Sequence, residues 1–144
     1  PLKFKFSFKT IVYTLSVTTQ RMVDTLILLL QVIIAIVIFA VWLVRPKLET
    51  NYRAGNATNI FEEFEVYGLP NWSVYLVGGI KLGLAILLIA GIWYSSVVQY
   101  AALGMGILMA GAIICHLKTR GDPLSRATPA SLMLVMCILV TCLA

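Results

Sequence analysis

Charged side chains are scarce in this sequence and make up only 12% of its 144 residues. A soluble domain usually has about 25% charged and about 45–50% apolar residues, whereas 60% of this chain is hydrophobic. So much apolar surface cannot be covered by the few polar residues present. An ordinary soluble domain is therefore excluded, and the chain needs a nonaqueous environment such as a lipid bilayer.

Histidine and cysteine, the residues on which most metal sites depend, are also few. There is one histidine and there are three cysteines, and Cys115, Cys137 and Cys142 lie in or at the end of apolar runs, where thiols behave as small hydrophobes. Metal-ligand spacings, nucleophile–base pairs and Gly-rich phosphate loops are all missing. The sequence therefore predicts no catalytic residue and no metal site, and a noncatalytic role is favoured over an enzyme.

The net charge of +5 raises the question of nucleic acid. The basic residues are scattered at the ends of apolar segments and are not gathered on one face. That distribution is typical of membrane flanks and not of a surface that follows a phosphate backbone. We expect membrane lipids and other membrane-protein subunits as partners, and no nucleic acid.

Four apolar segments are long enough to cross a bilayer, for which a helix of about 20 residues suffices. They are predicted at residues 22–44, 73–92, 97–115 and 130–144. The second and third are separated only by the uncharged turn 93–96, which indicates an antiparallel hairpin. The predicted fold is an all-α, polytopic four-helix membrane bundle over residues 22–144.

Residues 1–21 precede the first span as a basic N-terminal arm. Apolar and polar residues alternate over residues 2–9 with the period of a strand, so we expect an extended arm on the lipid surface or against a partner. The arm has 4 basic residues, and the first and third loops together have 6. The positive-inside rule does not set an orientation from these numbers.

The first loop contains a second pattern. Ile60, Phe61, Phe64 and Tyr67 recur at helical spacing, and three glutamates occupy the other positions. This predicts a short amphipathic helix at the membrane interface.

Three polar residues lie inside the predicted spans and are candidate site residues. Lys81 is the only charged residue well inside a span, and an intramembrane lysine is a functional candidate because it is costly there. The alternatives to a functional role are that the Lys81 side chain reaches the membrane interface or that it pairs with a first-loop glutamate. Asp24 and Gln31 share one face of the first span, where a polar path is one reading and interhelical hydrogen bonding is the favoured one.

His116 follows the third span at the lipid–water boundary. A single imidazole could ligate haem iron or chlorophyll magnesium, although an ordinary interfacial histidine is the commoner case. Small residues suited to close helix packing recur in the second and third spans; they are Gly79, Gly83, Ala102, Gly106 and Ala110.

Residues 61–144 contain several motifs in a characteristic order. These are the runs 64–70 (FEVYGLP), 77–83 (VGGIKLG), 109–118 (MAGAIICHLK) and 121–123 (GDP). With these motifs the chain resembles the DoxX-like membrane family. The resemblance implies a four-helix membrane bundle with diverse functions, some of them linked to quinones. Family members usually have a glutamate where this chain has Lys81, which puts in doubt any activity that depends on an intramembrane carboxylate.

Three functions are compatible with these features. The favoured one is a noncatalytic accessory subunit of a larger membrane complex, with an energy-converting complex of the thylakoid or mitochondrial inner membrane as the expected setting. The second is the membrane subunit of a quinone-linked oxidoreductase, in which Lys81, Gln31 and His116 would supply polar groups. The third is an assembly chaperone. Bound lipid, quinone or chlorophyll are the ligands considered.

Overall fold

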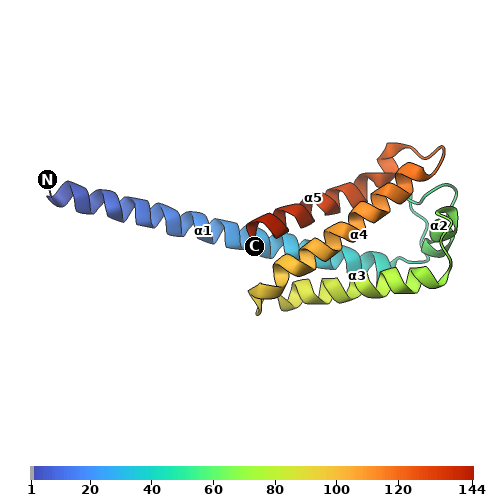
Figure 1. The fold of residues 1–144 in the computed structure, drawn as a ribbon, viewed down its shortest axis with the longest axis horizontal. Coiled ribbons are helices and arrows are strands. Elements are labelled where there is room, and N and C mark those ends of the chain that lie inside the picture. Colours follow the sequence, from blue (N-terminus) through green and yellow to red (C-terminus); the bar gives the residue numbers. More distant parts are fainter. Residues whose placement is uncertain (1) are drawn as a thin grey trace.

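The computed structural model describes the backbone of residues 2–144 and the side chains from residue 8 onward, and no strand occurs in that range. The helices in chain order are α1 (Leu2–Phe39), the π-helical η1 (Ala40–Val44), α2 (Ile60–Val66), α3 (Trp72–Ala90), η2 (Ser95–Val97), α4 (Val98–Lys118), η3 (Leu124–Ala127) and α5 (Thr128–Leu143). Figure 1 shows α3, α4, α5 and the second half of α1 as a bundle, with α2 at one end and the α3–α4 turn at the other.

The predicted four-helix membrane fold is confirmed. Four stretches are long and apolar enough to cross a bilayer: Phe8–Val44, Trp72–Ala90, Ser95–Lys118 and Leu124–Leu143. The fourth span is longer than predicted because the 3-10 turn η3 leads directly into α5, which has a proline in its first turn. A proline there replaces an N–H that would have no helical acceptor.

The core of the bundle is built from small and medium-sized side chains. Ile34, Leu88, Met105, Cys137 and Val140, drawn from all four long helices, are almost completely buried. The core-facing part of α1 starts at about Ile27. The faces turned away from this core are apolar as well, which is the arrangement expected where lipid and not water surrounds a helix bundle.

The first part of α1 shows that the prediction of an extended arm is wrong. The helix runs from Leu2 through Arg21 without a break. A helix satisfies its own backbone N–H and C=O groups, whereas a lone strand leaves them unpaired. The 38 residues of α1 and the 5 of η1 form a rod of about 65 Å at a rise of about 1.5 Å per residue. Its N-terminal part stands clear of the bundle (Figure 1).

A short helix does occur in the first loop, as predicted, and Asn59 caps it. The Asn59 side chain accepts hydrogen bonds from the backbone N–H groups of Phe61 and Glu62, both at 3.0 Å. The prediction placed all three glutamates on the polar face of this helix, whereas Glu63 is buried beside Ile60. The position of α2 at the membrane interface stays a prediction.

The predicted small-residue positions separate into two groups. On α4, Ala102 is fully buried, and a Cβ added to Gly106 would lie 3.4 Å from the Cβ of Cys137, so this face packs closely on α5. Gly79 and Gly83 on α3 differ, because an added Cβ would meet nothing within 4 Å among the described residues. Their face is open in the isolated chain.

Gly78 lies next to this open face but is itself packed tightly, and substitutions at Gly78 and Gly79 should therefore have different effects on stability. A Cβ at Gly78 would lie 2.5 Å from the ring of Trp42, so Gly78→Ala should destabilise the bundle by about 1–3 kcal/mol through overpacking. Gly79→Ala is the matched control and should be neutral or stabilising by up to about 1 kcal/mol, because alanine favours helix. Unfolding in mixed micelles measures both variants, and equal stabilities would contradict the packing described.

Candidate functional site

A cavity of about 460 Å³ lies at the α2 end of the bundle. Apolar side chains of η1, α2, α3 and α4 form much of its wall, and they include Val41, Trp42, Phe64, Val77 and Leu108. Six side chains with titratable groups also line it: Arg53, Glu63, Tyr67, Lys81, Cys115 and His116. A largely apolar cavity with a few polar groups is typical of a site for a small lipophilic molecule.

Lys81 is the most unusual member of this lining. It is the tenth of the 19 residues of α3, midway along the span, and only 9% of its surface is exposed. It forms no hydrogen bond or ion pair with any described residue, and its Nζ lies 5.3 Å from the ring centroid of Trp42. Cation–π contact stabilises an ammonium group but leaves its N–H donors free. Lys81 therefore offers donors to a molecule in the cavity.

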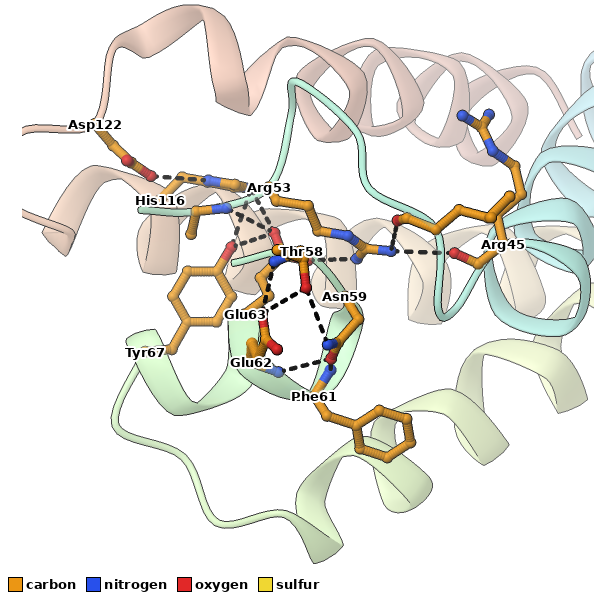
Figure 2. A network of polar contacts seen from close by, with 12 residues as sticks. Arg45, Arg53, Thr58, Asn59, Phe61, Glu62, Glu63, Tyr67, His116 and Asp122 are labelled. Atoms are coloured by element: carbon orange, nitrogen blue, oxygen red, sulfur yellow. Dashed lines mark hydrogen bonds and ion pairs between the residues drawn. The ribbon is translucent and has the colours of Figure 1, made fainter. Parts of the chain in front are cut away.

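Glu63 is the centre of a polar cluster, shown in Figure 2, that forms part of the wall of this cavity. Its Oε2 lies 2.7 Å from Nη1 of Arg53 in a buried ion pair. Its Oε1 accepts hydrogen bonds from the Tyr67 hydroxyl at 3.0 Å and from the backbone N–H of Ala54 at 3.3 Å. Arg53 also donates to the carbonyl of Arg45 at 3.2 Å. The carboxylate thus joins the first loop to α2.

His116 connects this cluster to α4. The Tyr67 hydroxyl donates its one proton to Glu63, so it accepts from Nε2 of His116 at 3.1 Å, which assigns the proton to Nε2. Nδ1 of His116 lies 3.8 Å from Oδ2 of Asp122, and both atoms are buried without a hydrogen-bond partner among the described residues. The ring is therefore enclosed on both sides. The haem or pigment role stays a prediction.

Asp122 fastens the third loop to the first. Its Oδ1 accepts from Nη1 of Arg126 at 2.7 Å and from the backbone N–H of Gly55 at 2.9 Å, and Arg126 also donates to the Gly55 carbonyl. Gly55 has a φ of +56°, a conformation that favours glycine. Both loops therefore lie on the same side of the bundle, and these hydrogen bonds hold them together.

Two pKa values on this side follow from the geometry. Burial, followed by the nearby Glu63 carboxylate, raises the pKa of Tyr67 well above its ordinary value, so its phenol stays a hydrogen-bond donor. Hydrogen bonds from the backbone N–H and the hydroxyl of Thr58 lower the pKa of Glu62. Glu62 therefore remains charged and supports the start of α2, and this support is lost only as the pH falls through its lowered pKa.

A second cavity, of about 580 Å³, lies on the other side of the cluster between the first loop, α1 and the start of α5. The two cavities share the side chains of Val41, Arg53, Glu63 and His116. The Arg53–Glu63–His116 group is therefore the wall between a loop-side cavity and the cavity that contains Lys81.

The predicted site residues fall at opposite ends of the molecule. Lys81 and His116 line the same cavity, whereas Gln31 and Asp24 line a different one at the α3–α4 turn. Gln31 makes no interhelical hydrogen bond within the described chain, and its Oε1 has no partner. Sequence reasoning missed Arg53, Asp122 and Arg126 and placed Glu63 on the wrong face of its helix.

A comparison with protein families matches the DoxX-like family model over residues 30–140. Because the match covers most of the chain, the protein belongs to the DoxX-like family. No curated protein and no solved structure shows significant similarity to the chain. The motifs that carry the resemblance meet in the structure, since Tyr67, His116 and Asp122 come from three of them and lie in one cluster.

The buried ion pair predicts a large effect of removing its carboxylate. Glu63→Gln leaves the Arg53 guanidinium buried without a counter-ion, and losing one partner of a buried pair costs about 3–5 kcal/mol. Glu65→Gln, on the exposed face of the same helix, is the control and should have little effect. Unfolding of the purified variants in detergent gives both values, and a stable Glu63→Gln protein would show that the pair is dispensable.

Proposed function

We propose that this membrane protein binds a lipophilic molecule with a hydrogen-bond-accepting head, of the quinone class, in the cavity beside Lys81. The observation that supports this most directly is an ammonium group that is buried at mid-span, has no hydrogen-bond acceptor in the described chain and faces an apolar cavity. A quinone carbonyl would accept from Lys81, and its ring and tail would lie against the apolar wall. The composition of the lining agrees, since it has two strongly basic side chains, Lys81 and Arg53, and one carboxylate, Glu63.

The neighbouring residues favour a head group fixed beside Lys81. The Tyr67 hydroxyl and Nη1 of Arg53 donate to Glu63 and so hold the carboxylate in place. Nε of Arg53 is a second buried donor without a partner in the described chain, so the lining offers a head group donors from Lys81 and Arg53. The lining extends down α4 from His116 to Ile107, about 13 Å at about 1.5 Å per residue. This length suits an elongated molecule lying along the span.

Binding is tested by quenching of Trp42 fluorescence with a short-chain quinone, in detergent or nanodiscs, in a protein whose exposed Trp72 and Trp93 are replaced by phenylalanine. In that background Lys81→Met preserves length and removes the donor, and it should weaken binding by about tenfold or more, since a hydrogen bond to a charged group contributes about 1.5–3 kcal/mol. Lys118→Met, at the exposed end of α4, is the control.

Equal quenching in the Lys81→Met and wild-type proteins would mean that the quinone reaches Trp42 from the bilayer and not from this cavity. Quinone turnover is a separate measurement. Binding without turnover supports a noncatalytic role, and turnover that fails in Lys81→Met supports a quinone-linked oxidoreductase subunit.

A second candidate, compatible with the first, is an accessory subunit of a larger membrane complex. Two features support it: the N-terminal part of α1 exposes Phe8, Ile11 and Leu15, and the face of α3 around Gly79 and Gly83 is open. A glycine pair four residues apart lets another transmembrane helix approach closely. The occupant proposed for this face is therefore a helix of a partner subunit.

Purification of the tagged native protein in mild detergent, followed by mass spectrometry and an absorption spectrum, tests this second candidate. Stoichiometric partners are expected for a subunit, and pigment or haem bands would indicate an energy-converting complex. Gly83→Leu should reduce the yield of partners severalfold, while Val135→Leu, on an exposed face of α5, should not. Partners found only with assembly intermediates would indicate a chaperone.

A further inference from the structure

A third cavity, of about 540 Å³, lies at the end of the bundle that is formed by the α3–α4 turn, opposite the end where α2 lies (Figure 1). Its wall combines α1, the α3–α4 turn and the end of α5. The polar lining side chains are Gln20, Asp24, Gln31, Ser95 and Ser96, and the apolar ones are Ile27, Leu28, Ile92, Val98 and Leu143.

Gln31 is the first sign that this cavity takes a ligand. Only 2% of its surface is exposed, and its Oε1 is buried without a hydrogen-bond partner in the described chain. A buried amide that is left unsatisfied is destabilising, so such a group is normally paired. The neighbouring α1 side chains Ile27, Leu30 and Ile34 are apolar and pack in or against the core. They offer Gln31 no hydrogen-bond partner.

The charge of the lining is the second sign. Asp24 is the only ionisable side chain among the residues that line this cavity, and no lysine, arginine or histidine balances it there. Its Oδ1 accepts one hydrogen bond, from Nε2 of Gln20 at 2.9 Å, which leaves further acceptor positions free. The hydroxyls of Ser95 and Ser96 add acceptors from the α3–α4 turn. The cavity thus presents one negative charge and several acceptors.

We infer that this cavity binds the ammonium head of an amphiphilic primary amine. The ammonium group would donate to Asp24 and to a serine hydroxyl, and the hydrocarbon would lie against the apolar wall formed by Ile27 and Val98. Gln31 lies seven positions after Asp24, about 10 Å further along α1 at about 1.5 Å per residue. Its amide would bind a second polar group of the ligand, deeper in the bundle.

This site is independent of the quinone-class site proposed above. The cavity that contains Lys81 has more basic side chains than carboxylates in its lining, whereas the cavity that contains Asp24 has a carboxylate and no basic side chain. The two cavities would therefore select different head groups, one that accepts hydrogen bonds and one that donates them. The two proposals make separate predictions for the same set of variants.

Native mass spectrometry of the whole chain in phosphatidylcholine nanodiscs tests the inference, with dodecylamine as the probe. Wild type should retain dodecylamine, and it should bind dodecanol and dodecanoic acid at least tenfold more weakly. Asp24→Asn should lower dodecylamine binding at least tenfold. Lys81→Met and Glu65→Gln are the controls and should leave amine binding unchanged even if the quinone proposal fails.

Gln31→Leu separates a ligand role from a structural one. If Gln31 serves a ligand, this variant should be at least as stable as wild type and should bind weakly any amine with a second polar group, such as a 12-carbon amine with a mid-chain hydroxyl. Dodecylamine itself should bind nearly as before. Unchanged amine binding in Asp24→Asn, or equal binding of the amine and the fatty acid by wild type, would overturn the inference.

Discussion

The buried carboxylate of Glu63 is the interaction on which the loop end of this protein depends. It joins Arg53 of the first loop, Tyr67 at the end of α2 and, through Tyr67, His116 of α4. These residues are far apart in sequence, and isolated loops of this length would be mobile on entropic grounds. The ion pair and hydrogen bonds of Glu63 hold these elements together next to the cavity. Lys81, in the same cavity, is only 9% exposed, and a hydrogen bond is stronger in such a buried position than in water.

The membrane fold could be predicted almost completely, and so could the short helix of the first loop, whereas the conformation of the N-terminal segment could not. A span is defined by length and hydropathy, both of which are local properties of the sequence. The alternation over residues 2–9 suggested a strand, but alternation predicts a strand only where a neighbouring strand supplies hydrogen bonds. With no such neighbour, the chain from Leu2 extends the helix of the first span instead.

The site was predictable only where one residue was anomalous by itself. Lys81 stood out because a charge inside an apolar span is costly, and the structure places it in a cavity. The cluster beside it was not predictable, because nothing in the sequence distinguishes Glu63 from Glu62 and Glu65, which are less buried, until the fold brings Arg53 to it. Pairing over 10 residues between Arg53 and Glu63, or over 67 between Gly55 and Asp122, leaves no periodic signal.

The cluster also bears on what the residue at position 81 contributes to the cavity. A glutamate there would place a second carboxylate in the lining beside Glu63, and two buried carboxylates repel unless they share a proton. The lysine of this chain brings a hydrogen-bond donor into the same lining instead. The bundle, the polar cluster and the other walls of the cavity need not differ between the two cases. On the function proposed above, this one side chain therefore decides whether the cavity suits a head group that accepts hydrogen bonds.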